Sequence, residues 1–362
     1  MMPISDSKQS ERRAASLPIA LTMGDACGIG PEIIARLWRT ALADGCFVVG
    51  DVAAMRRAVA LTGGLLVVAR IDCARDALDM PPACVPVLQV DAIPSDLLDA
   101  RVGQVDARAG KAAALSIEAA VRLVLGGEAG AIVTAPIHKE AFAAAGVPYP
   151  GHTEMLQALA ARGGVAPPVR MMLANDQLRT VLVTIHMSLR DAIEAVTFDA
   201  VLETIQITHR CAQRAGQHQP RIAVAGLNPH AGEAGLFGDE ELRIIGPAVE
   251  AARREGIDAR GPFAPDTVFM RARHAPAPAG SPAGTTGHVG EFDFVVAMTH
   301  DHGLIPVKYL GVENGVNVTL GLPFVRTSPD HGTAFDIAGT AVADPSSLLA
   351  ALRMARTLMS TA

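Results

Sequence analysis

The stretch that decides the fold is residues 18–31, PIALTMGDACGIGP. Its first five residues form a short apolar run, which predicts a buried strand. A glycine-rich turn follows at residues 23–30. Pro31 stands where proline is favoured, in the first turn of a helix, and a helical pattern continues from there to Ala43. A strand that passes through a tight turn into a helix is the opening of a β-α-β unit.

The same alternation of strands and helices continues along the chain. Helix-length patterns cover residues 110–125 and 345–359. Further β-rich runs are predicted at residues 131–134, 170–173, 180–185, 221–225 and 294–298. No internal repeat interrupts them. This order predicts an α/β architecture with a mostly parallel sheet.

Length and composition agree with that class. A chain of 362 residues exceeds the size at which one hydrophobic core usually stops growing, so two domains are expected. Half of the residues are hydrophobic but only 4% are aromatic, so aliphatic side chains must fill the core. The net charge is −6 and no run of Lys and Arg stands out, which argues against a surface for nucleic acid or anionic membranes.

The cysteines and the start of the chain predict a soluble cytoplasmic protein. Five cysteines, an odd number without a CxxC pair, fit a reduced compartment better than a disulfide framework. Residues 1–15 are polar and charged, unlike a signal peptide. No segment has about 18 uninterrupted apolar residues, the minimum for a membrane-spanning helix.

Three histidines follow predicted strands by one to five residues: His186, His230 and His300. Ligands of parallel sheets bind beyond the carboxyl ends of the strands, so these side chains are expected at one rim. Three neutral imidazoles with an open position suit Zn²⁺ or a similar divalent ion. The alternative is that each is an ordinary hydrogen-bonded histidine at a strand end.

A second group is cationic and polar. Lys308, Asn317 and Arg326 stand nine residues apart in apolar sequence rich in glycine. An arginine fork and a lysine charge bind phosphate or carboxylate, so we expect an anion site, with ordinary surface charge as the alternative. The turn at residues 23–30 lacks the third glycine of a dinucleotide fingerprint, because Ile33 occupies that place, which disfavours a Rossmann site.

Taken together, these segments resemble the 4-hydroxythreonine-4-phosphate dehydrogenase family of vitamin B6 biosynthesis, from about Pro18 to Leu358. The resemblance depends on long strings in order: MGDACGIGPEI (23–33), TAPIHKE (134–140), PGHTE (150–154), LNPHAGE (227–233), APDTVF (264–269), HDHGLIPVKY (300–309) and GLPFVRTSPDHGTA (321–334).

The resemblance implies an isocitrate/isopropylmalate-dehydrogenase-like fold of two α/β/α domains with the active site in the cleft between them. It also implies a homodimer whose subunits share each active site. The expected division is a disordered extension at residues 1–16, a first domain of residues 17–140 plus 315–362, and a second domain of residues 141–314 that carries dimerisation and the metal ligands.

The resemblance also assigns site residues. The metal ligands are His186, His230 and His300. The substrate contacts are His152, Thr153, Asp266, Lys308, Asn317 and Arg326, with Asp266 or Lys308 as the catalytic base. NAD binds in this family without the usual glycine fingerprint, and the residues implied for it are Gly315, Asn317, Gly321, Arg326 and Thr333. The metal is Zn²⁺, with Mg²⁺, Co²⁺ and Mn²⁺ as alternatives.

The expected activity is NAD- and metal-dependent oxidation, with decarboxylation, of 4-phosphohydroxy-L-threonine in pyridoxal phosphate biosynthesis. The alternatives are 4-phospho-D-threonate and 4-phospho-D-erythronate, with a cis-dihydrodiol dehydrogenase, a metal-dependent hydrolase or a non-catalytic binding protein as remote ones. The chain departs from the family at Ala26 and Cys27, usually Pro-Ala, at His302, usually Gln, and in a longer loop at residues 274–290. His302 would place an extra titratable group beside the metal.

Overall fold

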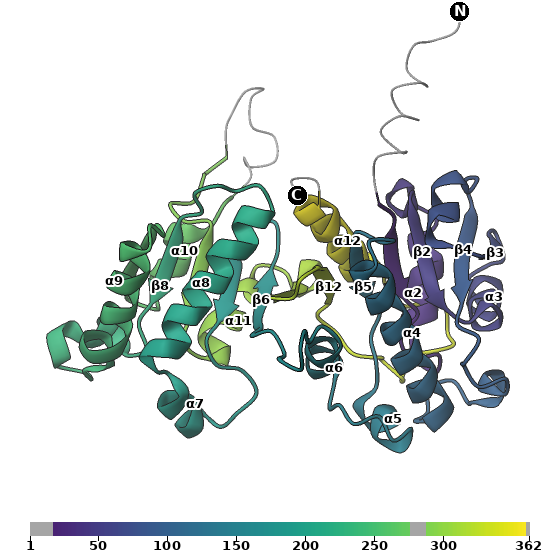
Figure 1. The fold of residues 1–362 in the computed structure, drawn as a ribbon, viewed down its shortest axis with the longest axis horizontal. Coiled ribbons are helices and arrows are strands. Elements are labelled where there is room, and N and C mark those ends of the chain that lie inside the picture. The colour runs from purple at the N-terminus through teal and green to yellow at the C-terminus, as the bar shows by residue number, and fades with distance from the viewer. Residues whose placement is uncertain (1–16, 276–286, 360–362) are drawn as a thin grey trace, which may run out of the picture. The chain divides into compact units, whose positions relative to one another are not determined.

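The computed structural model describes residues 17–275 and 287–359 (Figure 1). The predicted extension at residues 1–16 lies outside them, as does most of the long loop at residues 274–290. The chain divides into two compact units. Unit 1 contains the chain up to Pro167 together with residues 322–359, and unit 2 contains residues 168–321.

Unit 1 is built on a sheet of parallel strands. Their order across the sheet is β3, β4, β2, β1, β5 and β12. The strands are β1 (Ile19–Thr22), β2 (Cys46–Gly50), β3 (Val67–Ile71), β4 (Cys84–Gln89), β5 (Ala131–Thr134) and β12 (Val325–Pro329). Every residue of β1, β2 and β5 is buried, as expected for parallel strands covered on both faces.

Helices cover the unit 1 sheet. They are α2 (Gly30–Leu37), α3 (Val52–Leu61), α4 (Ala107–Leu125), α5 (Lys139–Ala144), α6 (His152–Leu159) and α12 (Ser346–Met359), with short 3₁₀ turns η1 (Ala41–Ala43), η2 (Ala74–Asp79) and η3 (Leu97–Asp99). Helix α4 packs on β1, β2 and β5, and α12 packs on β12 and β5. The helix predicted through Ala43 was too long: α2 ends at Leu37, because Thr40 is extended and its hydroxyl bonds the Leu37 carbonyl.

Unit 2 has a mixed sheet in the order β11, β6, β7, β10, β8 and β9. Its strands are β6 (Arg170–Ala174), β7 (Arg179–Leu182), β8 (Ile222–Ala225), β9 (Ala259–Phe263), β10 (Phe294–Ala297) and β11 (Val316–Leu320). Strands β7, β10, β8 and β9 are mutually parallel, whereas β6 runs antiparallel to both of its neighbours. The turn between β6 and β7 is closed by the Asn175 side chain, which accepts from the N–H groups of Gln177 and Leu178.

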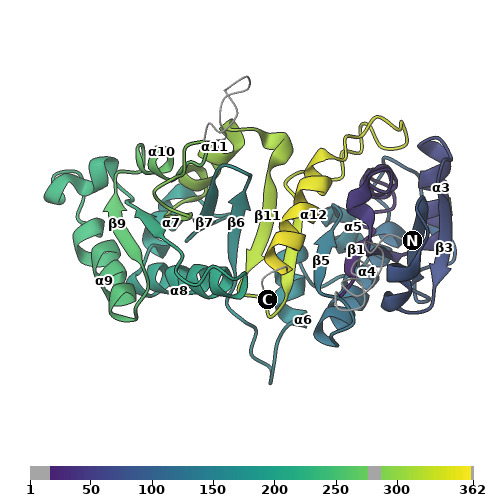
Figure 2. The same cartoon turned by 90° about the horizontal axis from the view of Figure 1, so that it is seen from above.

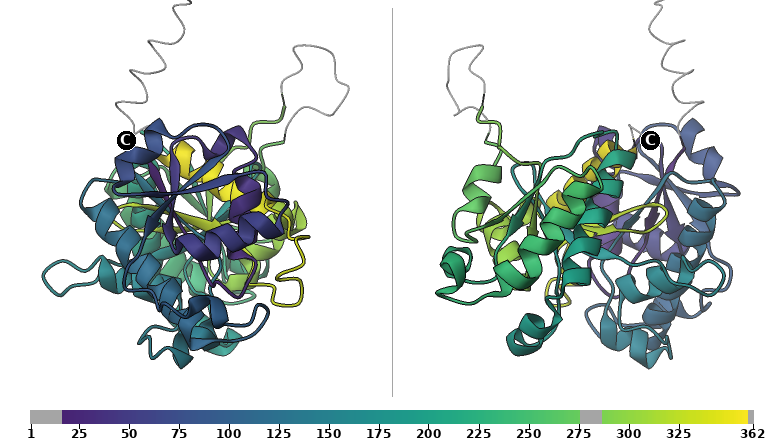
Figure 3. Two further views of the ribbon diagram at one scale, coloured as in Figure 1. Left: turned by 90° about the vertical axis from the view of Figure 1, so that its right-hand side faces the viewer. Right: turned by 60° about the vertical axis from the view of Figure 1, so that its left-hand side comes forward.

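The helices of unit 2 lie on both faces of this sheet. Figures 2 and 3 show α8 and α9 over one face, and Figure 2 shows α10 and α11 over the other. The helices are α7 (Leu189–Ala195), α8 (Phe198–Arg214), α9 (Gly246–Arg254), α10 (Val268–Ala272) and α11 (His300–Tyr309), with shorter turns η4 (Pro229–Gly235), η5 (Glu241–Ile245) and η6 (Val312–Asn314). The core between the sheet and helices α10 and α11 includes Leu182, Phe292, Val295 and Leu304.

The predicted α/β class is confirmed, and none of the described helices is long and apolar enough to cross a membrane. The expected domain boundaries differ from the observed division. Residues 141–167 belong with unit 1, because α5 and α6 pack on α4. Residues 315–321 belong with unit 2, because β11 pairs with β6. Strands β2, β3, β4, β9, β11 and β12 had not been predicted.

Candidate active site

The three histidines follow three neighbouring strands of unit 2. Strand β10 pairs in parallel with β7 on one side and with β8 on the other. His186 follows β7, His300 follows β10 and His230 follows β8. The carboxyl ends of these strands meet at one edge of the sheet, so the topology brings all three segments to that edge.

His186 and His300 are close together. Their ring centroids are 5.6 Å apart at an interplanar angle of 48°. The Nδ1 atom of His300 lies 2.8 Å from a carboxylate oxygen of Asp301. A carboxylate at Nδ1 holds the ring in one orientation and leaves Nε2 for a metal ion, an arrangement typical of metal-binding histidines. The chemistry of this pair therefore fits a divalent metal ion.

His230 is carried by a left-handed turn, η4. The backbone φ angles are positive at six successive residues, 53° at His230, 53° at Ala231, 76° at Gly232, 42° at Glu233, 56° at Ala234 and 97° at Gly235. Left-handed backbone costs roughly 1–2 kcal/mol per residue with a Cβ, and such strain persists only where surrounding contacts hold it.

Within the described part of a single chain, no three His, Cys, Asp or Glu side chains form a group able to hold a metal.

The remaining unit 2 residues of the predicted site come from three elements. Asp266 is exposed between β9 and α10, beyond the end of a strand that neighbours β8. Lys308 is exposed in the last turn of α11, the helix that begins at His300. Asn317 is half-buried on β11, opposite Leu173 of β6. Sequence reasoning did not foresee that Asn317 lies within a strand.

Unit 1 contributes a buried cation. Arg326 lies on β12 with only 3% of its surface exposed, and its Nη2 donates to the Thr134 hydroxyl oxygen on β5 at 2.7 Å. Burial lowers the pKa of Arg326 to about 10, so the guanidinium is still charged at neutral pH. A guanidinium offers a planar fork of donors that matches phosphate or carboxylate, which suits a site for an anion.

His152 begins α6 in the same unit, beside Thr153. Its Nε2 atom is buried and has no hydrogen-bond partner in the structure. Burial, and then the charge of Arg326, hold the pKa of His152 well below its ordinary value. The ring is therefore neutral, and its free nitrogen is available to a ligand group such as a phosphate hydroxyl or oxygen.

Two of the residues implied for the cofactor have their backbone groups engaged in packing. The Gly321 N–H donates to the Cys211 sulfur at 3.3 Å. The Thr333 carbonyl accepts from the Ile29 N–H at 3.0 Å, and a Cβ on Gly28 would lie 2.8 Å from the Thr333 Cβ. The glycine-rich turn is thus packed closely against the loop at Thr333.

Sequence reasoning missed Asp25, which lies in that turn. It is fully buried; one carboxylate oxygen accepts from the Cys27 N–H at 2.8 Å and the other has no partner. Burial raises the pKa of Asp25 to about 6, against the opposing effect of the Cys27 bond and of the His138 charge. A carboxylate between apolar residues of a glycine-rich turn was the available signal.

His302, the departure from the family pattern, is half-buried on α11. Burial lowers the pKa of His302 below its ordinary value, partly offset by the charge of Asp301. Its Nδ1 atom is buried and has no partner in the structure. The side chain is accordingly neutral at pH 7, so it adds no positive charge near His300.

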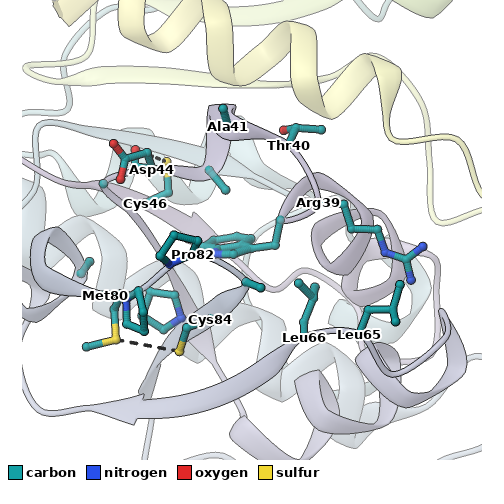
Figure 4. Close-up of a pocket in the computed structure, with 17 residues that line it drawn as sticks. Arg39, Thr40, Ala41, Asp44, Cys46, Leu65, Leu66, Met80, Pro82 and Cys84 are labelled. Carbon is teal, nitrogen blue, oxygen red and sulfur yellow. Dashed lines mark hydrogen bonds between the residues drawn. The ribbon is translucent and has the colours of Figure 1, made fainter.

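A cavity of about 630 Å³ lies elsewhere in unit 1. Figure 4 shows Cys46 and Cys84, the first residues of β2 and β4, among the side chains that line it, with Met80, Pro82 and Leu66. It therefore opens at the amino ends of the strands, whereas ligands of parallel sheets bind at the carboxyl ends. None of the predicted site residues lines this cavity.

Comparison with known proteins places these features in a family. Residues 43–355 match the model of the pyridoxal phosphate biosynthetic protein PdxA. A 4-hydroxythreonine-4-phosphate dehydrogenase of Beijerinckia indica is 54% identical over 91% of this chain and 92% of that protein. A D-threonate 4-phosphate dehydrogenase of Pectobacterium atrosepticum is 44% identical over 94% and 98%. The crystal structure of a 4-hydroxythreonine-4-phosphate dehydrogenase from Klebsiella pneumoniae has a TM-score of 0.85 at 42% identity, covering 95% of this chain and 98% of that one.

Proposed function

Because the chain belongs to the pyridoxal phosphate biosynthetic protein PdxA family, we propose that it oxidises 4-phosphohydroxy-L-threonine with NAD⁺ and a divalent metal ion. Its relatives are dehydrogenases, and the chain is an oxidoreductase of this kind. The further parts of the proposal are the metal, the cofactor, the residue roles and the place in pyridoxal phosphate biosynthesis.

The observation that carries the proposal is the placement of His186, His300 and His230 after three adjacent parallel strands. These three imidazoles would hold the metal, Zn²⁺ first and Mg²⁺, Co²⁺ or Mn²⁺ as alternatives. A bound divalent ion supplies Lewis-acid chemistry, lowering the pKa of the substrate hydroxyl and polarising the ketone that forms from it. Asp301 would keep His300 oriented through its Nδ1 atom.

The phosphate end of the substrate would meet Arg326 and His152. Arg326 supplies a buried positive charge, and His152 supplies a neutral nitrogen that lacks a partner. Thr153 follows His152 at the start of α6 and would add a hydroxyl donor. Lys308 and Asn317 are our further candidates for substrate contacts.

Oxidation requires a base for the hydroxyl proton, and Asp266 or Lys308 would provide it. NAD⁺ would supply the hydride acceptor for the carbon that bears this hydroxyl. The 3-keto acid that results loses CO₂ readily. Gly315, Asn317, Gly321, Arg326 and Thr333 remain our candidates for the cofactor side. We further propose a cytoplasmic homodimer in which both subunits contribute to each site.

A second substrate class is favoured by one finding, the 44% identity to a D-threonate 4-phosphate dehydrogenase. 4-Phospho-D-threonate and 4-phospho-D-erythronate carry a hydroxyl in place of the 2-amino group. The two classes share the phosphate and the oxidised carbon, so the same Arg326 and histidines would serve both.

The deciding experiment is NAD⁺ reduction, followed by absorbance, with all three phosphorylated acids in parallel, each with and without a chelator. We expect 4-phosphohydroxy-L-threonine to be oxidised fastest and the chelator to stop the reaction. Faster oxidation of either sugar acid would move the assignment to the second class. Reduction with none of the three would overturn the proposed activity.

A further inference from the structure

The left-handed turn that carries His230 is closed by a carboxylate from the helical segment that follows it. Glu241 is the first residue of η5 and is buried, with 3% of its surface exposed. Its Oε1 accepts from the backbone N–H of Leu227 at 2.7 Å and of Asn228 at 2.8 Å. Its Oε2 accepts from the Asn228 side-chain amide at 2.9 Å. Both oxygens are therefore used to hold the strand-to-turn junction.

Glycines make room for this carboxylate. A Cβ on Gly226 would lie 2.9 Å from Oε1 of Glu241, and a Cβ on Gly232 would lie 2.7 Å from Oε2. A Cβ on Gly238 would lie 2.5 Å from the Asn228 side-chain nitrogen. The backbone therefore closes directly against Glu241 and Asn228, and the turn cannot shift without breaking their contacts.

The link from Glu241 to His230 is short. Asn228 stands two residues before His230, and its carbonyl accepts from the Ala231 N–H at 3.1 Å. Pro229 lies between them and restricts the backbone to one φ. On the other side of the turn, the Phe237 ring centroid is 6.0 Å from that of His230. Fixing Asn228 thus fixes where the backbone of His230 leaves β8.

We infer that Glu241 is a positioning residue for His230, and this inference builds on the metal site proposed above. Glu241 is buried among backbone donors, so its effect reaches the site through Asn228 and the turn. Its three hydrogen bonds offset the cost of the left-handed residues and hold the His230 imidazole in one position, from which it would contribute to the proposed metal site. Partners of metal ligands commonly affect metal affinity by about 10–100-fold when they are replaced.

The test is Glu241→Gln in the full chain. The amide keeps one oxygen for the two backbone donors but sets an NH₂ group against the Asn228 amide, so two donors face each other. The matched control is Glu250→Gln, the same change at an exposed position of α9 whose carboxylate pairs with Arg253. Co²⁺ is the probe, because its visible spectrum reports ligand geometry.

We expect chelator-treated Glu241→Gln to bind Co²⁺ about 10–100-fold more weakly than the unaltered protein, with a changed visible spectrum, at a temperature well below its melting point. With both proteins free of metal, amide hydrogen exchange over residues 226–242 should also be faster in Glu241→Gln than in the unaltered protein. Glu250→Gln should match the unaltered protein in Co²⁺ affinity, visible spectrum and hydrogen exchange. If Glu241→Gln folds poorly, Asn228→Ala cuts the same link and should weaken Co²⁺ binding about tenfold.

The outcomes separate the two proposals. Equal Co²⁺ affinity and equal spectra in the unaltered protein and Glu241→Gln would overturn the positioning role alone. Absence of Co²⁺ binding by the unaltered protein would overturn the metal site itself, and the positioning role with it. A lower melting point with unchanged Co²⁺ affinity would make Glu241 a purely structural residue, which also contradicts the inference.

Discussion

At the residue scale, two buried charges of unit 1 dominate. Arg326 is 3% exposed and lies on β12, and Asp25 is 0% exposed and follows β1 of the same parallel sheet. Burial favours the neutral form of both side chains: it lowers the pKa of Arg326 to about 10 and raises that of Asp25 to about 6. Only Asp25 therefore titrates near physiological pH. Arg326 therefore keeps its positive charge at neutral pH, whereas Asp25 contributes a pH-dependent cost to folding.

Replacing Arg326 by Ala should raise KM for the phosphorylated substrate by about 10–100-fold, because a charge-assisted hydrogen bond contributes roughly 1.5–3 kcal/mol. Arg326→Lys should recover part of this loss, since it keeps the charge without the planar fork. Steady-state kinetics with the substrate and with its unphosphorylated analogue measure the effect. An equal loss with the analogue would show that Arg326 does not bind the phosphate.

Asp25 should make stability fall as pH rises. Its pKa is about 6 in the folded protein and 3.8 in the unfolded chain, so between these values the folded state holds a proton that the unfolded state has lost. The unfolding free energy should therefore decrease through this window and remain about 3 kcal/mol lower above it. Asp25→Asn should remove this decrease. Urea titrations at pH 4 and pH 7 measure the unfolding free energy of the unaltered protein and of Asp25→Asn. The same change with pH in both proteins would contradict the prediction.

At the element scale, close approaches between backbones explain several glycines that carry no chemistry. Gly110 lies in α4 where α5 crosses it, and a Cβ there would be 2.0 Å from the Ala141 carbonyl oxygen. The turn η4 is a second case, in which three glycines surround Glu241 and Asn228. In both places the sequence pattern shows a glycine but not the backbone that it faces.

Gly110→Ala should destabilise the protein by about 1–3 kcal/mol, the usual cost of overpacking, because the helices must separate. The clash outweighs the gain of about 1 kcal/mol in helix propensity that Ala offers over Gly. The control is Gly332→Ala, where a Cβ would meet no atom within 4 Å. Thermal and urea unfolding measure both, and a more stable Gly110→Ala protein would refute the close packing of α4 on α5.

At the scale of the whole molecule, the candidate residues are divided between two units. Arg326, His152 and Asp25 lie in unit 1, whereas the three histidines, Asp266, Lys308 and Asn317 lie in unit 2. In unit 2 the three histidines and Asp266 lie beyond the carboxyl ends of parallel strands, where α/β proteins bind ligands. Ligand binding by either unit should be coupled to the stability of the whole fold.

Metal removal tests that coupling. A metal that binds only the folded protein stabilises it by about 2.7 kcal/mol at a hundredfold excess over its Kd. Chelator treatment should therefore lower Tm, and added Zn²⁺ or Co²⁺ should restore it. His230→Ala should lose both the metal-dependent rise in Tm and turnover. A rise in Tm retained by that variant would remove His230 from the ligand set.

By itself, the sequence determined the α/β class and located several buried elements closely. β5 was predicted at its observed bounds, and β1, β6, β8 and β10 within a residue at either end, because strands that are wholly or mostly buried are largely apolar runs. The long motif strings likewise identified the family before any strand was paired.

Only the tertiary structure decided which segments become neighbours. The pairing of β10 with β7 and β8 joins strands far apart in the chain, and local apolar patterns carry no information about partners. Arg326 and Asn317 lie in strands, although their polar side chains interrupt the pattern that would have revealed them. The left-handed turn at His230 also escaped prediction, because the buried carboxylate that holds it comes from the next helical segment.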